Sequence, residues 1–285
     1  MEPTARHVSA GGKVTIAPDT RSVVVGDLPA ITRRPWWQRA ARYLVLQWGS
    51  LIVLGIIWEI LGHTLKLQWL PPLSAVFAEL FRLFATNELP QHLLSSFSML
   101  AIGLSLAIVV GLTVGTLMGV FSSVFTALDV YVNALFVTPS LIFAPILFAI
   151  FGLSDITRFS VVFLYGVFVI IINTASGIRN VDAPLLDMAA SYGASRWKTV
   201  IRVVLPSAFP MILAGLRLSV GRSVKGMING EMFIALVGIG GLISSFSKQY
   251  NFSAVWAISL FIMLIAILLN QVVGALEKRF TSWVG

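Results

Sequence analysis

Long apolar runs alternate with short polar segments along most of this 285-residue chain. A helix needs roughly 20 apolar residues to cross the hydrocarbon core of a bilayer. Strands of a membrane barrel would be about ten residues long with alternating polarity, and the runs do not have that pattern. We therefore predict an all-α membrane bundle of about six transmembrane helices, over residues 44–62, 93–120, 130–152, 159–178, 206–237 and 252–276.

Two polar segments outside these runs have patterns of their own. Residues 1–35 are polar, with scattered Gly, Pro and Thr, which predicts a disordered basic tail. The membrane domain is then expected over residues 36–285. Ser74 is placed to cap a short amphipathic helix that ends near Ala85 and suits the outer membrane surface. Glu59, inside the first run, is expected to pair within the bundle.

The composition supports a membrane bundle and excludes several kinds of activity. Hydrophobic residues make up 57% of the chain and charged residues only 11%, whereas soluble domains carry about 25% charged residues. Cysteine is absent, which excludes disulfides, thiolate zinc sites and a cysteine nucleophile. The three histidines are scattered, and the sequence has no nucleotide-binding loop or nucleophile motif. We expect no enzyme activity, no catalytic residue, no metal site and no cofactor in this chain.

Lysine and arginine are distributed unevenly between the two sides of the predicted bundle. With six spans both termini lie on one side, and that side would hold 13 of the 20 basic residues. Because cytoplasmic segments are enriched in Lys and Arg, both termini and the loop before the fifth span are placed in the cytoplasm. The net charge of +8 belongs to these segments and does not indicate a nucleic acid partner. The opposite side would hold only Lys66, Arg82, Arg158 and Lys248.

The cytoplasmic loop before the fifth span has the pattern of two short helices. Asp182 can cap a first helix, whose first turn would contain Pro184 and Asp187. Gly193 can end this helix with a positive φ, and Ser195 can cap a second one. The apolar face of the second helix would comprise Trp197, Val200, Ile201 and Val204.

The loop would thus form a helix–glycine–helix elbow that closes at Leu205-Pro206, where the fifth span begins. A structured loop of this length in a membrane protein is often functional. The elbow could be the docking site of a soluble motor, or an ordinary interfacial loop anchored by Trp197.

Residues 187–206 resemble the EAA loop of the inner-membrane permease subunits of ABC importers. That signature reads Glu-Ala-Ala, three residues, Gly, nine residues, Ile, any residue and Leu-Pro. All spacings match, and the three departures, Asp for Glu, Met for Ala and Val for Ile, are conservative. The matching positions are Asp187, Met188, Ala189, Gly193, Val203, Leu205 and Pro206.

The resemblance covers about residues 70–280 and implies how the protein is driven. The loop 182–206 would be a coupling helix that inserts into a groove of a separate ATPase subunit, which binds ATP and Mg. Two such ATP-binding cassette subunits, two permeases and an extracytoplasmic solute-binding protein would assemble in the bacterial cytoplasmic (inner) membrane. The coupling residues would be Asp187, Met188, Ala189, Gly193, Trp197, Leu205 and Pro206.

Shorter segments look like the nitrate, sulfonate, taurine and bicarbonate branch of that family. They include Trp58-Glu59, residues 70–76, Phe151-Gly152 and residues 230–232. Members of that branch usually act as homodimers, and the resemblance implies import of a small, anionic organic or inorganic solute. The branch carries several kinds of solute, so the resemblance does not fix which one.

Charged residues at membrane depth are costly and tend to face a cavity or a partner. Helical spacing puts Arg222, Lys225 and Asn229 on one face of the fifth span, where they could attract an anionic solute. The two cations could equally pair with a partner subunit or mark the cytoplasmic end of the span. Glu231 lies roughly opposite and is interpreted as a packing or hinge hydrogen-bonding group beside the path.

Proline and glycine inside the runs also indicate local structure. Pro139 and Pro145 are expected to bend or interrupt the third helix, a shape that suits a gate, with Phe143 and Phe148 as apolar plugs. A glycine stripe in the second run favours close helix packing, and a second glycine group resembles a turn at the membrane surface. The stripe comprises Gly103, Gly111, Gly115 and Gly119, and the second group comprises Gly238, Gly240 and Gly241.

Two other classes of protein compete with this interpretation. A stand-alone secondary transporter or channel for a small anion would need no docking loop and would often show paired repeats, which we do not find. A membrane-anchored scaffold would not need buried cations or bent helices. Both are therefore less consistent with the sequence.

Overall fold

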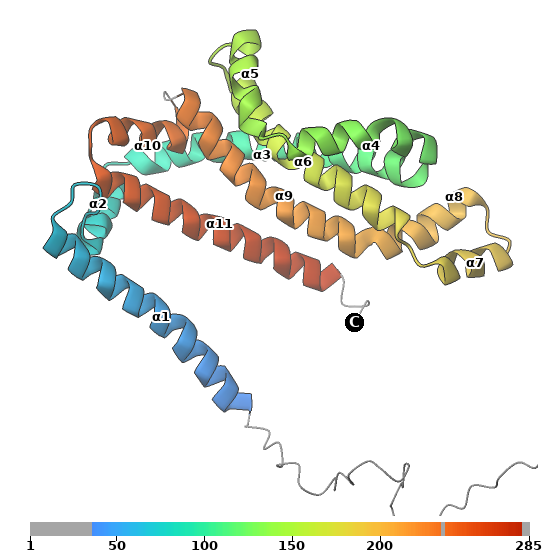
Figure 1. The fold of residues 1–285 in the computed structure, drawn as a ribbon, viewed down its shortest axis with the longest axis horizontal. Coiled ribbons are helices and arrows are strands. Elements are labelled where there is room, and N and C mark those ends of the chain that lie inside the picture. Colours follow the sequence, from blue (N-terminus) through green and yellow to red (C-terminus); the bar gives the residue numbers. More distant parts are fainter. Residues whose placement is uncertain (1–35, 235–236, 281–285) are drawn as a thin grey trace, which may run out of the picture. The chain divides into compact units, whose positions relative to one another are not determined.

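The structure is a computed structural model that describes residues 36–234 and 237–280 (Figure 1). All regular elements within these residues are helices, which confirms the all-α prediction. The chain divides into two compact units, residues 1–54 and 55–285. Helix α1 (Trp36–Leu65) starts in the first unit and continues into the second. The tail predicted over residues 1–35 lies outside the described residues.

The second unit contains the remaining helices, and four of its helical segments are long and apolar enough to cross a membrane. They are α3, α6, α8 to α9 and α11, and a bent pair formed by α4 and α5 would be a fifth. In α1 the apolar segment Gly49–Leu65 is shorter. The predicted count of six is therefore not confirmed. The helices are α2 (Leu73–Ala85), α3 (Glu88–Val120), α4 (Ser122–Val137), the 3-10 helix η2 (Ser140–Phe143), α5 (Ala144–Phe151), α6 (Asp155–Arg179), α7 (Ala183–Ser191), α8 (Arg196–Thr199), the π-helix η3 (Val200–Val204), α9 (Leu205–Ile234), α10 (Gly238–Lys248) and α11 (Phe252–Phe280).

The third predicted span, 130–152, is interrupted, as its prolines predicted. Helices α4 and α5 are bent by 93° at the break between them, where Pro139 precedes the 3-10 turn. Proline disfavours helical backbone in the residue before it, and Thr138 is extended, with φ −65° and ψ 128°. Pro145 lies in the first turn of α5, a position that proline tolerates. Pro139 therefore accompanies the bend, while Pro145 starts a helix.

The glycine stripe of α3 packs directly against α6, as predicted. A Cβ added to any of the four glycines would lie 2.6 or 2.7 Å from the Cβ of an α6 residue, a distance that real atoms do not adopt. The partner number is 59 higher in every pair, so the two helices run parallel in constant register. The pairs are Gly103–Val162, Gly111–Ile170, Gly115–Thr174 and Gly119–Ile178.

Helix α6 is the centre of the bundle. In its most apolar 18-residue stretch, 61% of the residues are buried, whereas 22% are buried in the corresponding stretch of each of the other three candidate spans. Helix α6 also packs against α9, again at glycines: Gly215 faces Asn173 and Gly226 faces Tyr165. Because the α9 number rises as the α6 number falls, these two helices are antiparallel.

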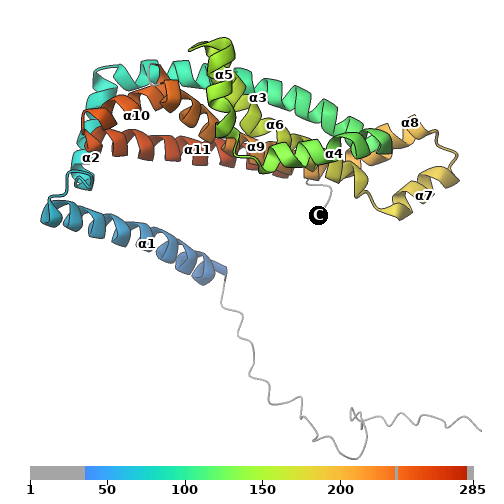
Figure 2. The ribbon, with the colours of Figure 1, turned by 45° about the horizontal axis from the view of Figure 1, so that its top comes forward.

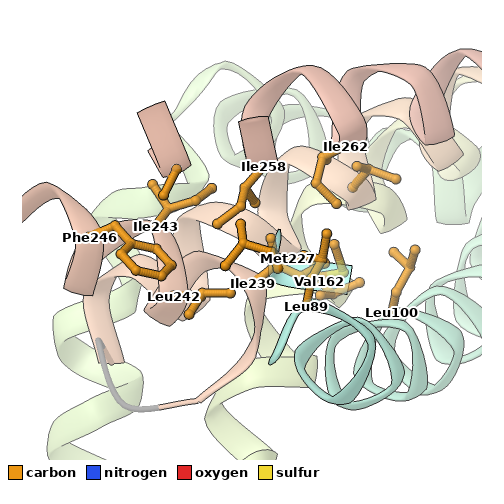
Figure 3. Close-up of a cluster of buried hydrophobic side chains, with 13 residues drawn as sticks. Leu89, Leu100, Val162, Met227, Ile239, Leu242, Ile243, Phe246, Ile258 and Ile262 are labelled. Atoms are coloured by element: carbon orange, nitrogen blue, oxygen red, sulfur yellow. The ribbon is translucent and has the colours of Figure 1, made fainter. Parts of the chain in front are cut away.

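Helix α10 has its apolar side in the main buried cluster, beside residues of α3, α9 and α11 (Figure 3). With 11 residues it is too short to cross a membrane. The turn predicted at Gly238, Gly240 and Gly241 is therefore wrong in form, because these glycines make up the first turn of a buried helix. Figures 1 and 2 show α10 and α2 at one end of the second unit, and α7 with α8 at the other.

The amphipathic helix predicted after the first run is α2, but Ser74 does not cap it. The N-cap position is Pro72, and Ser74 instead donates two hydrogen bonds to the carboxylate of Glu59. They run from its N–H (3.0 Å) and its Oγ (2.7 Å). The expectation that Glu59 pairs within the bundle is confirmed.

Candidate coupling elbow and intramembrane groove

The elbow predicted before the fifth span is present, and Gly193 is its pivot. Helix α7 begins after Asp182 with Pro184 in its first turn, and α8 begins after Ser195. Gly193 has φ +67°, and a Cβ there would meet no atom within 4 Å. Backbone conformation, and not space, therefore requires glycine at this position. Asp187 is outside the first turn of α7, where no acidic residue lies, so its predicted role at that helix start is wrong.

The second arm of the elbow does not end at Leu205-Pro206 as predicted. Helix α8 continues through the π-helical turn η3 into α9, and the whole segment Arg196–Phe233 is one apolar helix. Pro206 has no N–H to donate to the preceding turn, and a π-helical turn occupies the residues directly before Leu205. Such turns mark functional positions in many helices. A motion of α8 can therefore be transmitted along α9.

Large apolar side chains at the elbow are exposed. Tyr192 is 86% exposed, Trp197 64% and Met188 50%. Ala189, in contrast, is buried. Trp197 contacts Phe121 edge-on, with ring centroids 6.3 Å apart. An exposed apolar group of this kind is a candidate interaction surface.

A groove of about 980 Å³ lies between α9, α10 and α11. Arg222 and Lys225 line it and are exposed, as the common face predicted for them requires. Arg217 also lines it and donates hydrogen bonds to Asn270 (2.8 Å) and Glu277 (3.3 Å) of α11. The apolar walls include Leu218, Ile228, Met232, Ile243, Ile262 and Met263.

The other predicted path residues do not line this groove: three lie at the break between α4 and α5, and Asn229 and Glu231 lie on α9. The Arg222 guanidinium lies over the ring of Phe136, 4.6 Å from its centroid, so Arg222 joins the groove to the end of α4. Asn229 donates to the Tyr165 hydroxyl of α6 (3.0 Å). Phe143 is partly buried in η2, and Phe148 stacks on Phe233 at 6.3 Å.

Glu231 is buried, 1% exposed, and belongs to a network that the sequence did not indicate. Its carboxylate pairs with Arg158 of α6 (2.6 Å) and accepts a hydrogen bond from Ser96 of α3 (2.7 Å). Arg158, which the charge count places on the side opposite the termini, is only 5% exposed and is paired inside the bundle. Its partner lies 73 residues away in sequence, so no local pattern could have revealed the pair.

No group of three or more potential metal ligands occurs among the described residues. The polar groups that line the groove are cations, amides and a hydroxyl, which can attract and orient an anion.

Fold and site together define a helical membrane protein with an exposed apolar elbow and a groove lined by cations. Residues 107–282 match the binding-protein-dependent transport system inner membrane component family. The chain belongs to this family and is the permease subunit of an ABC importer.

Named relatives are similar over most of their length. The chain is 29% identical over 272 residues to the taurine transport system permease protein TauC of Escherichia coli (strain K12), covering 93% of this chain and 98% of that protein. It is 27% identical over 259 residues to the bicarbonate transport system permease protein CmpB of Synechococcus elongatus, covering 87% of this chain and 90% of that protein.

Among solved structures, the MetNI methionine ABC transporter in an inward-facing conformation is similar in fold. The TM-score is 0.59 with 16% sequence identity, over 68% of this chain and 96% of that chain. This likeness concerns the fold alone.

Proposed function

We propose that this permease, as one of two identical copies, forms the path for a small organic or inorganic anion delivered by an extracytoplasmic solute-binding protein. Two separate ATPase subunits, which bind ATP and Mg, would drive it through residues 187–206. Relatives named for taurine and bicarbonate transport support an anionic solute. The alternative of a stand-alone transporter or channel does not fit a binding-protein-dependent family.

The elbow supports the proposed coupling to an ATPase. Its apolar side chains are exposed at the tip of α7 and α8, and the second arm is continuous with α9, which lines the groove. A partner that moves α8 would therefore displace the cations of α9. We assign Asp187, Met188, Ala189, Gly193 and Trp197 to this contact surface. Leu205 and Pro206 lie at the junction with α9.

The single observation that carries the anion path is the position of Arg222 and Lys225 in the groove. Glu231 lies near the end of α9, and at about 1.5 Å per residue Lys225 is roughly 9 Å and Arg222 roughly 13 Å further along the axis. We place the end of α9 at the interface of a hydrocarbon core about 30 Å thick, which puts both cations inside the core. Charges at such depth require a water-filled cavity or a partner, and the groove supplies the cavity.

The break between α4 and α5 lies beside one of these cations. Transporter sites are commonly built where helices are discontinuous, and Phe136, under Arg222, is the second-last residue of α4. We propose that Pro139, Phe143 and Pro145 shape the path at this point. Asn229 is assigned a secondary role through Tyr165, and Glu231 a structural one.

The orientation follows from the basic residues. We propose that the elbow end and both termini face the cytoplasm, where positive charge is enriched. The end that contains α2 and α10 then faces the solute-binding protein.

The test is uptake by proteoliposomes that contain the permease, its ATPase subunit and its binding protein, with labelled taurine, nitrate and bicarbonate as probes. Wild type should accumulate at least one of them with ATP. Arg222→Ala combined with Lys225→Ala should reduce that uptake at least tenfold while the complex still assembles. Lys248→Ala is the matched control, since it removes an exposed cation outside the groove. Unchanged uptake in the double variant would refute the anion path.

A further inference from the structure

The buried pair of Arg158 and Glu231 does more than neutralise two charges. Glu231 Oε1 accepts from Arg158 at 2.6 Å, and Oε2 accepts from Ser96 Oγ at 2.7 Å and from the backbone N–H of Gly240 at 3.1 Å. Four helices, α3, α6, α9 and α10, therefore meet at one carboxylate.

Helix α10 receives its N-terminal cap from this network. The N–H groups of the first turn of a helix have no partner within the helix. Here the N–H of Ile239 donates to Ser96 Oγ (2.8 Å) and that of Gly240 to Glu231. The N-cap residue of α10 itself, Val237, makes no side-chain cap hydrogen bond. A carboxylate at this end also has favourable electrostatics with the helix dipole.

The start of α10 is shaped to fit the carboxylate. Gly238 has φ +80°, and a Cβ there would collide with the carboxylate of Glu231. A Cβ on Gly240 would collide with the carbonyl oxygen of Ile228 and lie 2.7 Å from the Cβ of Glu231. Both glycines are needed for Glu231 to reach the backbone of α10.

Helix α10 is also one wall of the groove proposed as the anion path. Ile243 lines that groove together with Arg222 and Lys225 of α9. Met232, the residue after Glu231, lines it too. The placement of α10 against α9 therefore sets the shape of the groove at this end.

We propose that Glu231 is a positioning residue for transport: it caps α10 from a neighbouring helix and so holds α10 as a wall of the groove, while Arg158 orients and neutralises the carboxylate. This inference rests on the proposed function for its link to transport. The competing explanation is that the apolar cluster around Ile239, Leu242 and Phe246 (Figure 3) holds α10 unaided. The pair would then serve only the folding of the chain.

Two double variants separate these explanations. Arg158→Met with Glu231→Leu removes both charges and every side-chain oxygen acceptor, and replacement of a buried ion pair by apolar groups is often tolerated. Arg158→Met with Glu231→Gln also removes both charges but keeps an oxygen acceptor for Gly240. Only the Met/Leu variant should allow α10 to move away from its place against α9.

The position of α10 can be measured without transport. The chain has no cysteine, so spin labels can be attached at Gln91→Cys on α3 and Ser247→Cys on α10, both exposed. In nanodiscs, pulsed electron paramagnetic resonance should give the same narrow set of distances for wild type and for the Met/Gln variant. The Met/Leu variant should give a broadened or shifted distribution, and in proteoliposomes its uptake should fall at least tenfold.

A milder variant covers the case in which the Met/Leu variant does not fold. Ser96→Ala removes the bridging hydroxyl without any change of charge, and should broaden the distance and lower uptake about threefold to tenfold. Ser98→Ala is its control, because Ser98 donates only to the carbonyl of Ser95 on the same helix.

Wild-type distances in both the Met/Leu and the Ser96→Ala variants would overturn the proposal, as would equal broadening in the two double variants. If wild type itself transports no anion, the proposed function fails. The distance measurement would still decide whether Glu231 holds α10.

Discussion

The buried ion pair at one end of the second unit and the exposed elbow at the other end differ in how their side chains are partnered. At the α10 end, Glu231 and Arg158 are buried and paired with each other, with Ser96 and with backbone N–H groups. At the elbow end, Tyr192 and Trp197 are large apolar side chains left mostly exposed. A buried carboxylate that its own chain satisfies holds neighbouring helices together, whereas the exposed apolar side chains of the elbow are available for another chain to cover.

The largest expected contrast comes from removing one charge at each end. Arg158→Met leaves Glu231 buried and unpaired, which should cost about 3–5 kcal/mol of stability. Arg196→Met removes an exposed charge at the elbow and should change stability by less than about 0.5 kcal/mol. Thermal unfolding of the permease in detergent measures both, and similar losses at the two ends would break the contrast.

The next effect concerns coupling and not stability. Gly193→Val forces a β-branched residue into a left-handed conformation, where such residues are outliers. We expect ATP-driven uptake to fall at least tenfold while membrane insertion persists. Gly193→Asn is the control, since asparagine tolerates this conformation, and it should retain most of the uptake. Normal uptake with Gly193→Val would remove the elbow from the coupling mechanism.

A smaller effect should follow from trimming the elbow tip. Tyr192→Ala removes an 86% exposed ring that makes no contribution to the folded core. Aromatic anchors at interfaces are often worth about 2 kcal/mol, so ATPase subunit binding should weaken by roughly tenfold or more. Tyr250→Ala removes another exposed ring, 65% exposed, near the α10 end, and titration of the ATPase subunit should show no change for it.

The smallest effect concerns pH at the α10 end. Hydrogen bonds from Arg82, and then from Asn251, hold the pKa of Glu79 on α2 below its usual value. Because the folded pKa is lowered, this stabilisation is present above the unfolded pKa and is lost as pH falls through the folded value. Arg82 is half exposed, so the contribution is below about 1 kcal/mol. Unfolding of Glu79→Gln should depend slightly less on pH below about 5 than that of wild type.

The sequence predicted most of the fold because membrane helices depend on local features. Apolar runs located α3, α6, α9 and α11. The glycine stripe of α3 was interpreted correctly, because regularly spaced small residues allow a neighbouring helix to approach closely. The bend at Pro139 and the positive φ of Gly193 were also predictable, because each depends on the backbone properties of one residue.

The features that the sequence did not indicate depend on contacts between distant segments. The ion pair of Arg158 was not predicted because its partner, Glu231, lies on another helix, 73 residues away in sequence. Ser74 looked like a helix cap, but it donates to Glu59 of α1. The continuity of α8 with α9 was not predicted. A proline in the sequence does not reveal that the residues before it form a π-helical turn, which here joins the two helices.

The central claim, that the elbow docks the ATPase subunit, can be tested by crosslinking. Because the chain has no cysteine, Tyr192→Cys and Tyr250→Cys each provide a single site for a photoactivatable thiol reagent in the assembled complex. We predict that the probe at position 192 captures the ATPase subunit and that the probe at position 250 does not. Capture at position 250 alone, or at neither position while the complex remains intact, would contradict the claim.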